Sequence, residues 1–152
     1  MVMVRSAVAN DQENIRALIH SERLNPTSLD WHNFIVATDE GGLVGAVQMR
    51  PHADGSRELG SLVVRKDARG TGVGAKLIDA LLAREKGRVH MITAKTYASH
   101  YERWGFHRIE PWFAPKMVRR NYQIGQFAAG ALSLFVGRMP RRLVILGRPS
   151  PA

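Results

Sequence analysis

Residues 58–75 read Glu-Leu-Gly-Ser-Leu-Val-Val-Arg-Lys-Asp-Ala-Arg-Gly-Thr-Gly-Val-Gly-Ala, an apolar run that leads into a turn with three alternating glycines. The apolar and β-branched residues of 58–65 predict a strand, and apolar residues at helical spacing over 73–86 predict a helix. Glycines let the backbone approach an anion closely, and the free N–H groups at the start of a helix stabilise negative charge. The stretch therefore predicts a strand–turn–helix unit that binds phosphate groups.

Phosphate-binding turns of two other kinds fit this stretch less well. A P-loop ends in Gly-Lys-Ser/Thr, whereas residues 74–77 read Gly-Ala-Lys-Leu and lack the hydroxyl that would hold magnesium. The dinucleotide-binding pattern G-x-G-x-x-G/A is satisfied by Gly70, Gly72 and Ala75. However, three predicted strands precede it, and residues 89–95 hold no acid for a ribose. A tight turn without any ligand stays open as the simplest alternative.

The remaining pattern predicts a mixed α/β fold with a central, mostly antiparallel sheet flanked by helices. The predicted strands cover residues 1–8, the two arms of a hairpin within 33–50, then 58–65, 88–93, 106–113 and 142–146; the predicted helices cover 10–23, 73–86, 97–104 and 116–126. This order of elements favours a mixed sheet over a bundle or a sandwich. A chain of 152 residues suits one domain, 1–152, in which residues 118–152 form a basic, partly apolar extension that packs on the rest.

The charge is concentrated toward the C-terminus. The formal net charge is +9, and the residues from Arg103 onward hold nine Lys or Arg but a single acid, Glu110. Such a region attracts anions, among them phosphorylated cofactors, nucleic acid and anionic membranes. A basic motif interleaved with aromatic residues is missing from the sequence, so we do not expect nucleic acid as a partner.

The composition also limits the location and the chemistry. The chain has no cysteine, which excludes disulfides, thiolate metal ligands and a cysteine nucleophile. No apolar run approaches the length of a transmembrane helix, and the first residues do not resemble a signal peptide. The histidines show no spacing typical of a metal site. We therefore expect a cytoplasmic protein without a metal or a transmembrane segment.

Two motifs in sequence resemble those of the GNAT superfamily of acetyl-CoA-dependent N-acetyltransferases. Arg69-x-x-Gly72-x-Gly74 follows the apolar strand, and residues 100–106, His-Tyr-Glu-Arg-Trp-Gly-Phe, come about thirty residues later. The resemblance covers residues 1–113. It implies a GNAT-like acyl-CoA N-acyltransferase fold, acetyl-CoA as the acyl donor and transfer of the acetyl group to a primary amine by direct attack. A noncatalytic acyl-CoA-binding or basic interaction module with the same fold is the alternative.

The resemblance also implies the residues of the donor site. The cofactor-binding residues are Leu62, Val63, Val64, Arg69, Gly70, Thr71, Gly72, Val73 and Gly74. The strand residues among them would contribute a backbone N–H to the oxyanion, and the turn would hold the pyrophosphate.

Acid–base chemistry needs two further groups. An alkylamine is mostly protonated at neutral pH, so a base that removes its proton assists the attack. Glu58 is the candidate base, although solvation of the strand end or pairing with Arg57 or another neighbour explains it equally well. Tyr101, at the position where many superfamily members have a tyrosine beside the sulfur, is the candidate donor to the leaving thiolate. Packing on the sheet is its alternative role.

The resemblance implies a small-molecule or peptide amine as the acceptor, and an amino acid, a polyamine, a drug, a protein N-terminus and a lysine stay open. Its site is predicted at the first helix, the link 25–33 and the hairpin, with Trp31, Gln48, Arg50 and His52 as lining residues. In the tail, apolar residues lie between basic ones: Phe127, Leu132, Leu134, Phe135 and Val136, with Arg138, Arg141 and Arg142. Core packing, a homodimer interface and a membrane-surface segment are alternative roles for it.

Overall fold

The computed structural model describes residues 1–137 and 141–152, and the chain divides into two compact units. The first unit comprises Met1–Arg50 and Leu59–Glu85, and the second comprises Pro51–Glu58 and Lys86–Ala152. Each unit combines antiparallel strands with helices, which confirms the mixed α/β class. The single domain over 1–152 stays a prediction.

The first unit holds four neighbouring strands in the order β1, β2, β3, β4. Its elements are β1 Met3–Ser6, η1 Ala9–Asp11, α1 Gln12–Ser21, η2 Trp31–Asn33, β2 Phe34–Asp39, β3 Gly42–Pro51, β4 Arg57–Val64, η3 Lys66–Ala68 and α2 Val73–Leu82. The segments labelled η are 3₁₀ turns, and the strands β3 and β4 each extend into the second unit. β2 pairs antiparallel with both β1 and β3, as the predicted hairpin requires.

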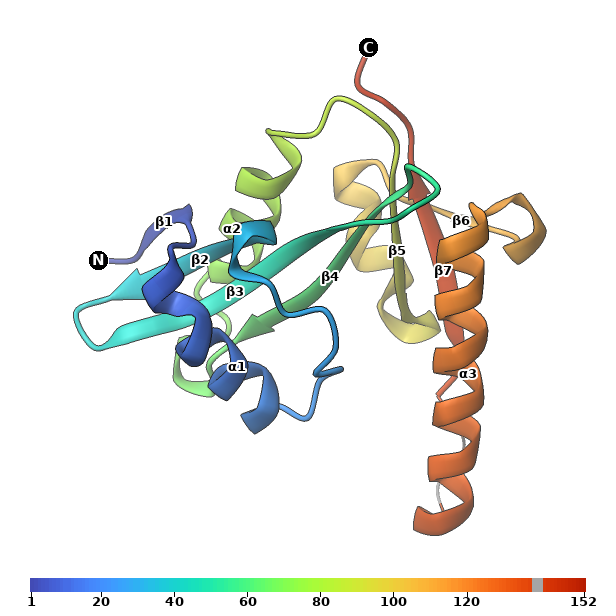
Figure 1. The fold of residues 1–152 in the computed structure, drawn as a ribbon, viewed down its shortest axis with the longest axis horizontal. Coiled ribbons are helices and arrows are strands. Elements are labelled where there is room, and N and C mark those ends of the chain that lie inside the picture. Colours follow the sequence, from blue (N-terminus) through green and yellow to red (C-terminus); the bar gives the residue numbers. More distant parts are fainter. Residues whose placement is uncertain (138–140) are drawn as a thin grey trace. The chain divides into compact units, whose positions relative to one another are not determined.

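Helices pack on both faces of these strands (Figure 1). On one face, Ile15 and Ile19 of α1 pack with Phe34, Val36 and Ala46 in a fully buried cluster. On the other face, Gly45 of β3 leaves room for α2: a Cβ at Gly45 would lie only 3.0 Å from Leu77 and 3.3 Å from Val73. This packing fixes the start of α2, and with it the glycine-rich turn, against the strands.

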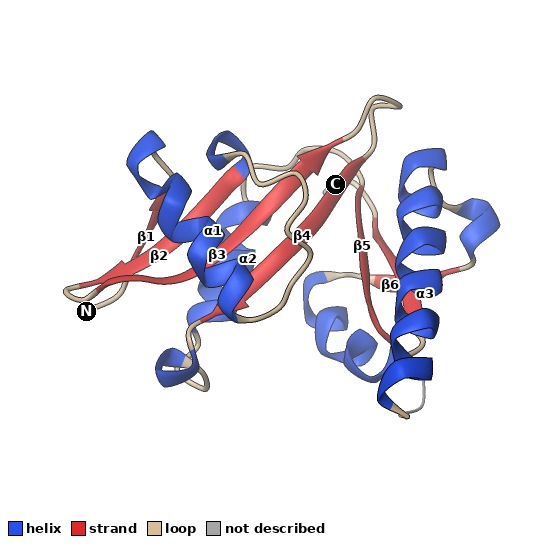
Figure 2. Cartoon of the chain, turned by 60° about the horizontal axis from the view of Figure 1, so that its bottom comes forward, coloured by secondary structure: helices blue, strands red, loops and turns tan. Residues whose placement is uncertain are grey.

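In the second unit β7 lies between β5 and β6 and pairs antiparallel with both. The elements are β5 Val89–Ala94, η4 Lys95–Trp104, β6 His107–Ile109, η5 Pro111–Phe113, α3 Lys116–Val136 and β7 Leu143–Arg148. Figures 1 and 2 show η4 and α3 on opposite faces of β5 and β7. Beneath α3, Val118 and Tyr122 pack on Ile92, Ile109 and Ile145.

The structure corrects three predicted boundaries. Residues 111–113 form a 3₁₀ turn rather than a strand, because Pro111 fixes φ and has no N–H for a ladder. Helix α3 continues beyond 126 to Val136, and Gly125 within it lets Leu143 of β7 pack closely, 3.1 Å from where a Cβ would stand. Helix α2 ends at Leu82, earlier than the predicted 86.

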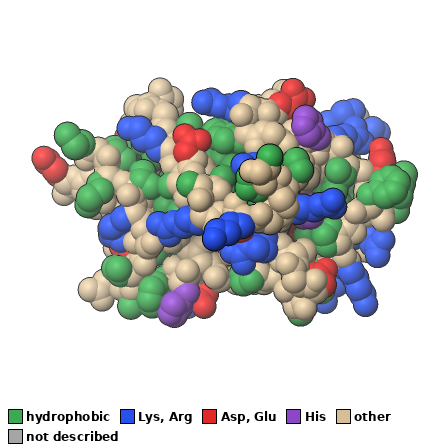
Figure 3. Space-filling view, turned by 90° about the horizontal axis from the view of Figure 1, so that it is seen from above, with side chains coloured by type: hydrophobic (Ala, Val, Ile, Leu, Met, Phe, Trp, Pro, Cys, Tyr) green, Lys and Arg blue, Asp and Glu red, His purple; other side chains and the backbone are tan. Residues whose placement is uncertain are grey.

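The C-terminal extension packs on its own unit through one face of α3. Along its length, α3 also exposes apolar side chains at Ile124, Phe127, Leu132 and Leu134. The predictions for Arg138 and for the side chains of Phe135 and Val136 lie outside the described residues. Basic side chains are spread among apolar ones on the face drawn in Figure 3, as the net charge of +9 leads one to expect.

Candidate functional site

The glycine-rich turn of the first unit has a backbone that only glycine adopts easily. Gly70 and Gly72 have φ of +75° and +85°, and Gly72 is the N-cap of α2. A Cβ at either position would meet no described heavy atom within 4 Å, so open space lies beside the backbone of both. No side chain of the described residues caps α2, which leaves its first N–H groups available to an anion.

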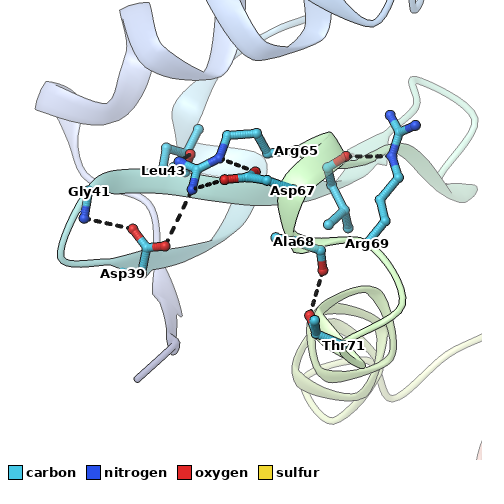
Figure 4. Close-up of polar contacts among 9 residues, drawn as sticks. Asp39, Gly41, Leu43, Arg65, Asp67, Ala68, Arg69 and Thr71 are labelled. Atoms are coloured by element: carbon cyan, nitrogen blue, oxygen red, sulfur yellow. Dashed lines mark hydrogen bonds and ion pairs between the residues drawn. The ribbon is translucent and has the colours of Figure 1, made fainter.

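The segment before the glycines is held in place by polar contacts (Figure 4). The guanidinium of Arg65 donates to Asp67 at 2.5 and 2.9 Å, and to Asp39 of the hairpin at 3.4 Å. These bonds lower the pKa of Asp67. The Thr71 hydroxyl donates to the Ala68 carbonyl at 2.5 Å. The turn is therefore preorganised by the protein itself.

Arg69 already has partners in the same unit. Its Nε donates to the Val64 carbonyl at 3.0 Å, and its Nη2 forms an ion pair with the carboxylate of Glu22. The Arg69 side chain is nevertheless 49% exposed. A phosphate that binds Arg69 must therefore compete with Glu22.

Strand β4 contains an irregularity that sequence reasoning missed. Ser61 has φ +52°, unusual for a residue other than glycine and placed directly before Leu62, Val63 and Val64. Its Oγ accepts hydrogen bonds from Gln48 Nε2 at 2.8 Å and from Arg50 Nη2 at 2.9 Å.

Gly60 allows this arrangement, since a Cβ there would lie 2.8 Å from Arg50 Nη1. Glycine inside a predicted strand often marks a position where another group approaches the backbone closely. Among the three strand residues predicted to bind the acyl donor, Val63 is 4% exposed, so only its backbone can contact a ligand. Leu62 and Val64 are partly buried.

Two of the four predicted acceptor residues, Gln48 and Arg50, are brought together within the first unit. Trp31 lines an open cavity of about 570 Å³ in the first unit, between α1 and residues 28–33. Gln48 and Arg50 both donate to Ser61 Oγ. His52 belongs to the second unit, where it contacts Glu58. The acceptor role of these residues stays a prediction.

In the second unit, Glu58 is a buried carboxylate with two donors on one oxygen. The side chain is 3% exposed, and its Oε2 lies 2.7 Å from His52 Nε2 and 3.1 Å from Asn121 Nδ2 of α3. Both readings of Glu58, as a base and as a paired residue, stay predictions. Asn121 was missed, because its approach depends on the packing of α3.

Tyr101 lies on η4 among aromatic side chains. Its ring is 6.5 Å from that of Phe106 in an edge-on arrangement. Burial raises the pKa of Tyr101 above its usual value of 10, and a hydrogen bond with Thr93 opposes this shift. The phenol therefore keeps its proton at neutral pH, as a proton donor must.

The described residues contain neither a cluster of metal ligands nor a membrane-spanning helix. No group of three or more histidines and carboxylates in that part of the chain could hold a metal ion. Among the helices of residues 1–137 and 141–152, none has both the length and the apolar character needed to cross a membrane.

Comparisons with known proteins agree with the geometry of the turn. The family model for the acetyltransferase (GNAT) domain matches residues 30–108. No curated protein matches the chain by sequence. The solved structures described next are each under 25% identical to it, so they show the fold alone.

These three structures show how the TM-score, the identity and the covered share of the chains vary. N-acetylglutamate synthase from Neisseria gonorrhoeae, with coenzyme A and N-acetyl-glutamate, has a TM-score of 0.74 and 20% identity; the comparison covers 100% of this chain but 36% of that one. Rv2747 from Mycobacterium tuberculosis, with CoA and NLQ, has a TM-score of 0.71 and 22% identity, over 98% and 99% of the two chains. The ribosomal-protein-S18-alanine N-acetyltransferase from Escherichia coli has a TM-score of 0.61 and 14% identity, over 100% and 96%.

The chain thus spans about a third of the length of the synthase and nearly all of the other two proteins. The family model covers more than half of the 152 residues and includes the strand β4, the glycine-rich turn and Tyr101. The chain belongs to the GNAT acetyltransferase family.

Proposed function

We propose that the protein transfers the acetyl group of acetyl-CoA to a primary amine. The observation that carries the proposal is the turn before α2, in which Gly70 and Gly72 leave open space beside uncapped N–H groups in a chain of the GNAT family. These features suit a pyrophosphate, whose charge the helix start stabilises. Crystallised relatives that carry CoA support the same donor.

In the proposed reaction the neutral amine nitrogen attacks the thioester carbonyl carbon directly. Glu58 accepts the proton that the nitrogen loses, directly or through water. The C–S bond then breaks, and Tyr101 gives its proton to the departing thiolate before regaining one from solvent. Backbone N–H groups of residues 62–64 stabilise the oxyanion. The products are the N-acetylated amine and CoA.

The contacts of Glu58 support its assignment as the base. A carboxylate that is 3% exposed loses most of its hydration, and its charge is kept stable by the hydrogen bonds from His52 and Asn121. We therefore assign these two residues to positioning the carboxylate. Their loss should weaken turnover through Glu58 rather than through the binding of acetyl-CoA.

For the acceptor we propose an amine of a small molecule or amino acid, with a protein N-terminus or lysine as the further possibility. The N. gonorrhoeae synthase is complexed with N-acetyl-glutamate, and the name of the E. coli enzyme gives a protein alanine as its acceptor. These relatives motivate a panel of glutamate and other amino acids, polyamines and an alanine-initiated peptide. A homodimer and a cytoplasmic location stay proposals alongside.

The experiment follows CoA release from acetyl-CoA with this panel, together with calorimetry of acetyl-CoA binding. We expect Glu58→Gln and Tyr101→Phe to lower kcat by roughly 10² or more while acetyl-CoA affinity stays nearly unchanged. Tyr97→Phe is the matched control for Tyr101, because Tyr97 lies on the same 3₁₀ helix and is 56% exposed. Its turnover should equal that of the wild type.

Two other outcomes would contradict the proposal. Acetyl-CoA binding without turnover of any amine would favour the noncatalytic acyl-CoA-binding module. Failure to bind acetyl-CoA at all would refute the donor assignment itself.

A further inference from the structure

A small polar cavity lies in the second unit, where β7 begins. Its volume is about 280 Å³, and it is lined by Lys95, Arg108, Tyr122, Gln126, Arg142, Leu143 and Val144. These residues come from the start of η4, from β6, from the inner face of α3 and from the start of β7. None of them was assigned a role in acetyl transfer.

The charges around this cavity are all positive. Lys95, Arg108 and Arg142 are exposed, and no Asp or Glu lines the space. Within residues 1–137 and 141–152, none of these three cations forms an ion pair. A concave site lined by one sign of charge concentrates counter-ions, and a bound anion relieves the repulsion among its cations.

The backbone around the cavity is fixed by hydrogen bonds. The Gln126 side chain accepts from the Leu143 N–H at 3.0 Å, and the Lys95 N–H donates to the Arg142 carbonyl at 2.8 Å. Tyr122 packs against the buried cluster beneath α3, while its hydroxyl has no partner among the described residues. The site thus combines three exposed cationic side chains with a backbone fixed by hydrogen bonds and with the neutral hydroxyl of Tyr122.

We infer that this cavity binds the oxyanion group of a small molecule, a carboxylate or a phosphate. Two guanidinium groups offer paired N–H donors that match the oxygens of either group, and a lysine adds a point charge. The volume is at the lower end of ligand sites, which are about 300–1,000 Å³, so the cavity suits one small anion rather than a polymer.

The inference does not depend on acetyl transfer, and its test needs only binding. Because the glycine-rich turn would also attract phosphate, the titrations are made in the Gly72→Glu background, whose added carboxylate repels anions from that turn. Inorganic phosphate and succinate are titrated separately by calorimetry at constant chloride. Arg108→Gln and Arg142→Gln are compared with Arg120→Gln, an exposed arginine of α3 that does not line the cavity.

We expect the double variant Arg108→Gln/Arg142→Gln to bind at least about 10-fold more weakly, and Arg120→Gln to bind as the background does. Binding of succinate alone would identify a carboxylate site, and binding of phosphate alone would identify a phosphate site. Equal affinity in the double variant and the background, or no binding of either anion, would overturn the inference. A thermal melt of each variant checks that it is folded.

Discussion

Substituting Gly72 by alanine separates the strain of the turn from its role in binding. Gly72 has φ +85° and is the N-cap of α2. Gly55, in a turn of the second unit, has φ +82°, and a Cβ at either glycine would enter open space. The same substitution at the two positions therefore imposes the same backbone strain without a steric clash, and Gly55→Ala is a matched control.

The expected loss of stability follows from the backbone alone. An alanine in the left-handed region costs roughly 1–2 kcal/mol relative to a conformation that it prefers. For a chain of 152 residues, each kcal/mol corresponds to about 2–4 °C in Tm. Both variants should therefore unfold roughly 2–8 °C below the wild type.

Binding of acetyl-CoA should distinguish the two variants. The methyl group at residue 72 would occupy the space where a pyrophosphate approaches the N–H groups of α2, so we expect affinity to fall at least about 10-fold. Gly55→Ala should bind as the wild type does. Thermal melts and calorimetry measure the two effects independently. Equal acetyl-CoA affinity in both variants, at equal loss of stability, would refute the assignment of the turn to the donor.

Three further substitutions test the packing and the electrostatics. Burial, and to a lesser extent the charge of Arg88, lowers the pKa of His90, so the unfolded chain binds the proton more readily than the folded chain. Stability should therefore fall as pH drops below about 6.5. His90→Phe should lessen the decline in Tm between pH 7 and pH 5, and an unchanged slope of Tm against pH would contradict this. The hydrogen bond from Arg5 lowers the pKa of Asp11, so Asp11→Asn should cost about 1–2 kcal/mol in urea unfolding at pH 7. The cost should shrink as pH falls through the lowered pKa of Asp11, because the wild-type carboxylate is then protonated too; a difference that stays constant with pH would point to packing instead. Ile19→Ala, at a fully buried position, should lower the free energy of unfolding by about 2–5 kcal/mol, and a loss under 1 kcal/mol would mean that α1 repacks.

The sequence was most informative where the signal is local. Alternating glycines, an apolar strand before them and helical spacing after them lie within residues 58–86, and the observed β4 and α2 follow that pattern closely. Turn geometry depends on the few residues that form it, so the glycines could be identified without knowledge of the fold. The family followed from the same stretch together with residues 100–106, and the family model confirmed it.

Contacts between distant segments could not be predicted in the same way. Glu58 and Asn121 are 63 residues apart, and their hydrogen bond exists only because α3 packs on its unit. The hydrogen bond from Arg50 to Ser61 likewise involves the positive φ of Ser61 in β4, which residue type and spacing did not indicate. Such contacts depend on tertiary packing, which residue type and spacing do not specify.

The contacts of Arg69 indicate which part of the turn should dominate donor binding. Arg69 is engaged by Glu22 and by the Val64 carbonyl, yet its side chain is 49% exposed. An ion pair this exposed contributes about 0–1 kcal/mol, so releasing it costs little, but exchanging one anionic partner for another also gains little. The backbone N–H groups beside Gly72 have no such competitor in the described residues. The affinity for a pyrophosphate should therefore depend on the glycine backbone more than on the charge of Arg69, which is why Gly72 is the residue that tests the site.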